Sequence, residues 1–414
     1  MNHINEIKDQ IQRQAHAIWR GGSGRGTIEA GTGFGKSRLF ILEVKRLWDE
    51  GLLNEQKVLL VVPTVKLRDD NWPREFADWD LSWLWENHVR AICFASLKNE
   101  KGNHYPFVGL DEMHHLTTLA ASAFSSDEED IFTAFFTENL CDSVMGLTAT
   151  APTKEDEPIK YRIMQQVAPT VFTYSLEDAI RDGLIADYQI RCIMTLLDDS
   201  DKYIPAGNKK KKSWMQTEKK TYEYMTSSLL KARIAVRTEK DPVKAAKLEE
   251  WADVSQYKLN RFLLTLKSKT NLAKRCIQML HEHQTGRGLI FFGGIDQCNE
   301  VMGEDVFHSK STSAAYDAFN REEISMLGVV DAANEGINFV KLDWELILAV
   351  GEKKRKMIQR IGRALRLREE DPTFKAIIYV LCIEDSLEKK WMDNSLSIFD
   401  PAKIHYYSHL DVPK

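Results

Sequence analysis

The fold is decided near the N-terminus by the stretch Glu29-Ala30-Gly31-Thr32-Gly33-Phe34-Gly35-Lys36-Ser37. A β-compatible Thr27-Ile28 precedes it and an amphipathic run follows it, which predicts the order strand, loop, helix. Glycines let backbone N–H groups surround phosphate oxygens at a helix N-terminus, and Gly31, Gly33 and Gly35 are placed for this. Lys36 would reach the β- and γ-phosphates, and the Ser37 hydroxyl would bind Mg²⁺. The stretch therefore predicts a phosphate-binding loop, with Ala30 where the strict pattern has glycine.

The bulk composition bounds the class of protein. The 414 residues, 43% hydrophobic and 28% charged, predict a globular chain of two or three domains. A net charge of −5 gives no general affinity for polyanions, so a nucleic-acid contact would need a local basic surface. Six widely spaced cysteines disfavour a zinc cluster or a disulfide framework. Without a signal core or a membrane-length apolar run, we expect a soluble, cytoplasmic protein and no membrane partner.

Polar residues follow three apolar runs in the first half. The run 58–62 ends in Pro63-Thr64, 105–110 leads into Asp111-Glu112-Met113-His114, and 144–147 ends in Thr148-Ala149-Thr150. Open α/β sheets bind ligands at the carboxyl ends of their strands, so these residues are expected at one edge. Asp111 would hold the metal and Glu112 would deprotonate the attacking water. We expect Thr148 and Thr150 to report the state of the carboxylate loop, and Thr64 to touch a phosphate backbone.

A second α/β unit is predicted in the later half. Apolar strands are expected at 288–293, 327–331 and 344–350, and the segment 359–368 then reads as a helix. Arg363 and Arg366 are three apart, so on a helix they share one face, with Gln359 one turn before Arg363. An arginine pair aimed at a γ-phosphate would stabilise transition-state charge. The alternative is a basic helix face that makes surface ion pairs.

Three features have two interpretations each. Gln14 lies on the predicted helix 3–20, where its amide is either solvated or reads the adenine edge. The tryptophans 72, 79, 83 and 85 either pack a domain face, the commoner outcome, or stack on bases. The run Lys209–Lys212 lies in the charged segment 199–257 and is either a solvated loop or a phosphate contact.

Taken in order, the motifs resemble those of superfamily 2 helicases of the DEAD/DEAH group. The resemblance runs from Gln14 to Arg366 and implies two RecA-like doubly wound parallel-sheet domains that bind ATP and Mg²⁺ between them. Gln14 resembles the adenine-reading glutamine of the family. Asp111–His114 resembles the family's metal-binding motif. The resemblance also implies that His114, Thr148 and Thr150 couple the nucleotide site to the rest of the protein. Glu335-Gly336-Ile337-Asn338 is similar to a further nucleotide motif, which implies that Gly336 and Asn338 contact ATP. The segment 359–366 matches the last motif, with both arginine positions at Arg363 and Arg366 and a catalytic role for Gln359.

The departures from the family pattern refine the expectation. Met113 replaces a small residue, Thr148 replaces serine, and Asn338 stands where aspartate is common. Gln359 replaces histidine, and the stretch after Pro63 lacks the arginine of RNA-acting members; both favour DNA-acting relatives such as phage recombination helicases and restriction motors.

We predict domains at 1–185 and 186–414, with a helical, Lys-rich insertion at about 199–284. The expected activity is ATP-dependent unwinding, translocation or branched-DNA remodelling, with largely sequence-independent nucleic-acid contacts. An RNA helicase and a nucleotide-gated clamp that does not unwind remain alternatives. A single-domain kinase would leave the second half without a role.

Overall fold

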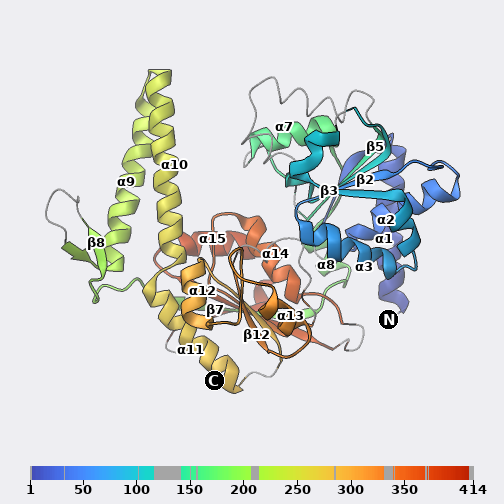
Figure 1. Ribbon diagram of the computed structural model, residues 1–414. Coiled ribbons are helices and arrows are strands. Elements are labelled where there is room, and N and C mark those ends of the chain that lie inside the picture. The colour runs from blue at the N-terminus through green and yellow to red at the C-terminus, as the bar shows by residue number, and fades with distance from the viewer. Residues whose placement is uncertain are drawn as a thin grey trace. The chain divides into compact units, whose positions relative to one another are not determined.

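The computed structural model describes residues 2–31, 33–100, 102–115, 141–149, 151–154, 157–206, 214–283, 286–330, 339, 341–368, 371 and 373–409. The chain forms two compact units, one built on Met1–Ala186 and the other on most of the chain from Asp187 onward (Figure 1). The described residues 366–368 belong with the first unit. Each unit has its own parallel sheet, which confirms the predicted α/β class with two doubly wound sheets.

The first sheet has the strand order β3-β2-β4-β5-β1-β6 within the described residues, and every neighbouring pair is parallel. Its strands are β1 (Arg25–Ala30), β2 (Val58–Val62), β3 (Val89–Cys93), β4 (Tyr105–Asp111), β5 (Cys141–Thr148) and β6 (Thr170–Tyr174). The first unit also contains α1 (Asn2–Gly21), α2 (Lys36–Asp49), a π-helical turn η1 (Leu67–Asn71), α3 (Trp72–Ala77), α4 (Ser82–His88), the 3-10 turns η2 (Phe94–Glu100) and η3 (Met113–His115), α7 (Pro158–Val167) and α8 (Leu176–Arg181).

Side chains of β2 alternate between two cores, as a strand buried on both faces requires. Leu60 packs with α1, α2, α3 and α4, whereas Leu59 packs with η2 and α7. The helices therefore cover both faces of the sheet, and the carboxyl ends of the strands are left for ligands.

The second sheet has the order β11-β12-β10-β13-β14-β7-β15, again with parallel neighbours throughout the described part. Its strands are β7 (Asp187–Thr195), β10 (Gly288–Phe291), β11 (Val306–Phe307), β12 (Met326–Val329), β13 (Trp344–Ile347), β14 (Lys375–Ile383) and β15 (Ile404–Ser408). Around it lie α11 (Lys267–His283), α12 (Ile295–Met302), α13 (Ala314–Asn320), α14 (Lys354–Ala364), α15 (Leu387–Leu396) and the 3-10 turn η4 (Pro401–Lys403).

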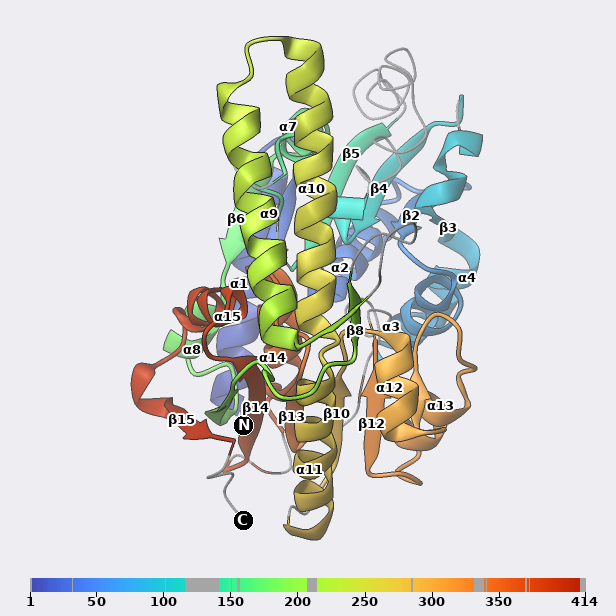
Figure 2. The ribbon, with the colours of Figure 1, turned by 90° about the vertical axis from the view of Figure 1, so that its left-hand side faces the viewer.

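Between β7 and α11 the chain leaves the second sheet. It forms an antiparallel ribbon of β8 (Ile204–Ala206) and β9 (Trp214–Gln216), followed by the long helices α9 (Glu218–Thr238) and α10 (Pro242–Leu264). Figure 2 shows α9 and α10 side by side as a helical hairpin. The basic run at 209–212 lies outside the described residues.

A buried ion pair joins two helices of the second unit. The Lys269 ammonium on α11 contacts the Glu388 carboxylate on α15, and both side chains are fully buried. Glu388 also accepts a hydrogen bond from the backbone N–H of Ile383 at 2.9 Å. Within the described residues, no helix is long and apolar enough to cross a bilayer.

Candidate nucleotide site

The phosphate loop joins β1 to α2 as predicted. Gly33 and Gly35 have φ angles of 88° and 80°. Residues other than glycine adopt this left-handed backbone conformation only with strain. Lys36 is the first residue of α2, and its Nζ donates to the carbonyl of Ala30 at 2.9 Å. The side chain therefore folds back over the loop that its own helix continues. Gly31 directly follows β1 and Ser37 is the second residue of α2, whereas Thr32 is outside the described residues.

A glutamine of α1 holds this loop, but it is Gln12 and not Gln14. Gln12 is 1% exposed, and its Nε2 donates to the Phe34 carbonyl at 2.5 Å and to the Gly35 carbonyl at 3.4 Å. Its Oε1 accepts a bond from Arg38 Nη1 at 2.6 Å. A Cβ on Gly35 would lie 2.6 Å from the Gln12 amide nitrogen, so this position also needs glycine for close approach.

The Gln14 side chain is exposed and makes none of these bonds to the loop, and its contact with adenine stays a prediction. Residues two apart on a helix point about 200° away from each other, so Gln12 and Gln14 cannot share a face. Helical spacing in the sequence could have identified Gln12 as buried. It lies three residues before Ala15 and seven before Trp19, so it shares a helix face with these two buried residues.

The two carboxylates stand at the end of β4, next to the loop. Asp111 Oδ2 accepts a hydrogen bond from the Trp72 indole Nε1 at 3.0 Å. Burial and the charge of Glu112 raise the pKa of Asp111 to about 7, whereas the Trp72 bond and the nearby Lys36 charge oppose this rise. Glu112 has φ of 47°, a left-handed conformation that is costly outside glycine and recurs at functional sites.

The predicted coupling residues meet Glu112 across the neighbouring strand. Because β4 pairs with β5 in parallel, Asp111 lies opposite Leu147 and the carboxylate loop faces Thr148. Thr148 Oγ1 donates to Glu112 Oε2 at 3.3 Å, and His114 Nδ1 lies 3.0 Å from the same hydroxyl. Ala149 N also donates to Glu112 Oε2 at 3.4 Å. The structure thus brings Glu112, His114 and Thr148 together, while Thr150 is outside the described residues.

Packing explains the methionine in this motif. Met113 is buried, and its sulfur accepts a hydrogen bond from the Thr27 hydroxyl at 2.9 Å. A Cβ on Gly146 would lie 2.3 Å from Thr27 Oγ1 and 2.5 Å from Met113 Sδ. A larger residue at position 113 is therefore accommodated because β5 has glycine beside it.

The residues predicted to touch nucleic acid follow β2. Thr64 is exposed and Pro63 is half-buried. The Thr64 hydroxyl accepts a bond from Leu67 N at 3.3 Å, so it also caps the π-helical turn η1. Of the nearby tryptophans, Trp72 is buried, whereas Trp79 and Trp83 are 45% and 40% exposed. The predicted packing role therefore holds for Trp72 and only in part for its neighbours.

In the second unit, α14 presents a buried polar face. Gln359, Arg360 and Arg363 are each 5% exposed or less. The Arg360 guanidinium donates to the Ala349 carbonyl, and the Arg363 guanidinium lies 5.6 Å from the centre of the Phe339 ring. Helix α14 ends at Ala364, so Arg366 lies beyond it and the predicted shared helical face with Arg363 is wrong. Gly336 and Asn338 are outside the described residues.

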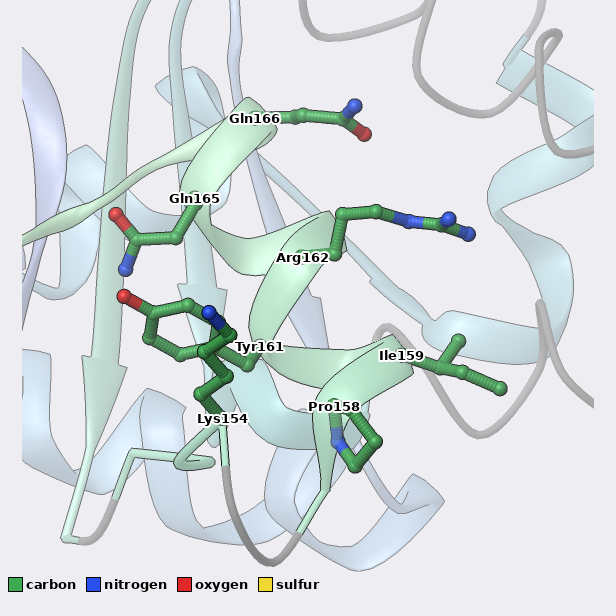
Figure 3. Close-up of a pocket in the computed structure, with 7 residues that line it drawn as sticks. All are labelled: Lys154, Pro158, Ile159, Tyr161, Arg162, Gln165 and Gln166. Carbon is green, nitrogen blue, oxygen red and sulfur yellow. The ribbon is translucent and has the colours of Figure 1, made fainter.

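One surface pocket lies apart from these residues. It has a volume of about 520 Å³ and is lined by Lys154 and by side chains of α7, among them Tyr161, Arg162 and Gln165 (Figure 3). It shares no residue with the phosphate loop or the carboxylates, so it does not extend the nucleotide site.

Comparison with known proteins shows what this chain is similar to. Residues 269–368 match the helicase conserved C-terminal domain, a span that includes α14. Over 403 residues the chain is 23% identical to the DNA 3'-5' translocase XPB2 of Sulfurisphaera tokodaii, which covers 90% of this chain and 82% of that protein. These two findings support a superfamily 2 helicase, which is an ATP-hydrolysing enzyme.

Solved structures agree on the fold of this helicase. S. cerevisiae Dbp5 bound to RNA and ADP BeF3 is similar with a TM-score of 0.60 and 11% identity, over 97% of this chain and 90% of that one. The ATP-dependent Type ISP restriction-modification enzyme LlaBIII bound to DNA has a TM-score of 0.54 and 13% identity, over 97% of this chain but only 31% of that one. The predicted RecA-like architecture of both units is confirmed.

Proposed function

We propose that this helicase is an ATP-driven motor that moves along or remodels DNA. The observation that carries the proposal is the likeness to the DNA 3'-5' translocase of Sulfurisphaera tokodaii over nine-tenths of the chain. The residues that depart from the RNA-acting pattern, Gln359 among them, favour the same substrate and a phage-type recombination or repair role. The likeness to the RNA-bound Dbp5 concerns the fold and does not choose between the two nucleic acids. RNA is therefore the second candidate substrate, and an experiment must distinguish it from DNA.

In the proposed site, ATP binds to the loop at Gly31–Ser37. When ATP binds, Lys36 Nζ would leave the Ala30 carbonyl and bind oxygens of the β- and γ-phosphates. Its positive charge would offset the negative charge of these phosphates. Ser37 and Asp111 offer one hydroxyl and one carboxylate, which suits Mg²⁺ because that ion takes one or two protein oxygens together with substrate phosphates. Bound Mg²⁺ would offset charge on the phosphate oxygens.

Glu112 is proposed as the general base. Its other carboxylate oxygen, Oε1, would accept a proton from the attacking water while the water oxygen bonds to the γ-phosphorus and the bond from that phosphorus to the β-phosphate oxygen breaks. The bonds from Thr148 and Ala149 to Glu112 Oε2 orient the carboxylate for this step and connect it to His114. We propose that this small network reports the state of the nucleotide, with Thr150 as a further member.

The second domain is proposed to complete the site. The domains are taken as 1–185 and 186–414, and Arg363 and Arg366 would contact the γ-phosphate, where an added arginine raises the rate by 10³- to 10⁵-fold in related chemistry. Gly336 and Asn338 are proposed as further nucleotide contacts. ATP would tie the domains together and hydrolysis would release them, so DNA held at Pro63-Thr64 would be gripped in alternation.

Two substitutions test the site. Lys36→Ala and Glu112→Gln should each reduce ATP turnover to background, with unfolding midpoints that stay near the wild-type value because both side chains are partly solvent-facing. Phosphate release measured with single-stranded DNA and with RNA then separates the substrates. Near-normal turnover in either variant contradicts the site, and stimulation by RNA alone favours the RNA helicase.

A further inference from the structure

Two aromatic rings of the second unit lie between two arginines. The Arg363 guanidinium carbon lies 5.6 Å from the centre of the Phe339 ring. Phe339 in turn meets the Phe319 ring edge-on, with 6.2 Å between the centroids and 78° between the planes. The Arg287 guanidinium carbon lies 4.2 Å from the centre of the Phe319 ring. Each distance is within the range at which a cation or a second ring is attracted to an aromatic ring.

The Phe339 ring is packed on more than one side. Its side chain is 3% exposed, and Tyr316 also contacts it edge-on, with 5.6 Å between the centroids and 74° between the planes. Tyr316 and Phe319 are three residues apart on α13, so both rings leave one face of that helix. Arg287 also donates to the Phe319 carbonyl, which ties α13 to the start of β10. The ring of Phe339 therefore lies in a packed cluster with little freedom to turn.

Contact with a ring suits an arginine that must bond a phosphate. An arginine side chain has several rotatable bonds, so a guanidinium that nothing holds would spend much of its time away from the nucleotide. The attraction to a ring acts through the π-system and uses none of the N–H groups that bond phosphate oxygens. A charged group that is placed before the reaction stabilises the transition state without being reorganised at that moment.

We propose that Phe339 is a positioning residue for the arginine that acts on the γ-phosphate. The inference rests on the proposed motor function, in which Arg363 contacts that phosphate. Phe339 holds the Arg363 guanidinium in one place, and the rings of α13 hold Phe339. Its effect on ATP hydrolysis passes through Arg363 alone. None of the motif resemblances assigns a role to position 339.

The same helix supplies a matched control. Arg360 lies one turn before Arg363 on α14, and its guanidinium carbon is 5.4 Å from the centre of the Phe291 ring. Phe291 is 2% exposed, and Arg360 donates to the Ala349 carbonyl, which is a contact within the fold. Phe339→Leu and Phe291→Leu therefore each remove one buried ring, of the same size, that contacts an arginine of α14. Only the first ring contacts the arginine that is proposed to act on ATP.

The experiment compares these two variants in the full chain. It measures kcat for ATP with single-stranded DNA and the affinity for a non-hydrolysable ATP analogue. Both variants should lower the unfolding midpoint, but only Phe339→Leu should lower kcat, by about 10- to 30-fold. A desolvated cation–π contact contributes up to about 2 kcal/mol, and about 1.36 kcal/mol is one factor of ten. The affinity of Phe339→Leu for the analogue should stay near the wild-type value, because Arg363 acts on charge that develops during the reaction, and Phe291→Leu should keep both values.

A second pair protects the test against misfolding of Phe339→Leu. Phe339→Met fills a similar volume without a ring and should show the same loss of kcat. Phe339→Tyr keeps the ring and should retain most of the wild-type kcat.

A double variant separates positioning from a general loss of packing. In Arg363→Ala the guanidinium is already absent, so the addition of Phe339→Leu should not lower kcat any further. A second fall in kcat in the double variant, an equal kcat in Phe339→Leu and Phe291→Leu, or a wild-type kcat in Phe339→Met would overturn the inference. A normal kcat in Arg363→Ala, or no ATP hydrolysis by the wild type, would instead overturn the proposed function.

Discussion

Replacing Gln12 with alanine is expected to weaken ATP binding, because this side chain fixes the phosphate loop from behind. It forms bonds of 2.5 Å to the Phe34 carbonyl and 2.6 Å from Arg38. A neutral bond contributes about 1 kcal/mol and one to a charged group about 1.5–3 kcal/mol, so truncation removes roughly 2–4 kcal/mol. If about half of this falls on loop order, ATP affinity drops on the order of tenfold, since 1.4 kcal/mol is one factor of ten.

Gln14→Ala is the matched control for this change. Gln14 is exposed on the same helix, and surface substitutions of this kind stay within about 0.5 kcal/mol. Isothermal titration with a non-hydrolysable ATP analogue and urea unfolding would be run on both variants. A loss of affinity in Gln14→Ala with normal binding in Gln12→Ala would refute the reasoning and support the adenine-reading role of Gln14.

Three further predictions follow from single contacts. Burial raises the pKa of Asp111 to about 7, above its unfolded value near 4, so the nucleotide-free protein binds more protons when folded and loses stability as pH rises from about 4 to 7. Asp111→Asn should remove up to about 4 kcal/mol of this loss of stability. Urea unfolding midpoints at pH 5 and pH 8 measure it, and a difference between the two midpoints that is the same as in the wild type would contradict the prediction. Lys269→Met should destabilise the second unit by about 3–5 kcal/mol because it leaves the Glu388 charge buried alone, and Lys269→Met/Glu388→Leu should recover most of it in the same assay. Arg363→Ala should lower kcat by about 10³-fold with little change in the affinity for ATP, and a normal kcat would rule out its contact with the γ-phosphate.

The strands and the phosphate loop could be predicted because each is determined by a short, continuous sequence pattern. The apolar run at 58–62 is β2 at the same residues, and Lys36 begins a helix directly after a glycine-rich turn. A continuous apolar run between turn residues indicates a strand buried on both faces whatever the rest of the chain does. The carboxyl ends of parallel strands then place Asp111 and Thr148 at one edge without further information.

The errors lie where tertiary packing decides. Helix α14 stops at Ala364, and the end of a helix is set by what packs against its last turn, so the shared face with Arg366 did not form. Burial of Gln12 could have been predicted from the sequence, because helical spacing places it on the same face as Trp19. The hydrogen-bond partners of a buried polar residue cannot be predicted in this way. The bond from Trp72 to Asp111 spans 39 residues, and only the placement of α3 beside β4 creates it.

The central claim is that nucleic acid controls ATP hydrolysis by this chain. The most direct measurement is the steady-state ATPase rate of the purified protein with no nucleic acid, single-stranded DNA, forked DNA and RNA, with Glu112→Gln as the blank. We predict strong stimulation by one or both DNA forms, a smaller effect of RNA and no turnover in the blank. Hydrolysis that is the same under all four conditions would contradict the account.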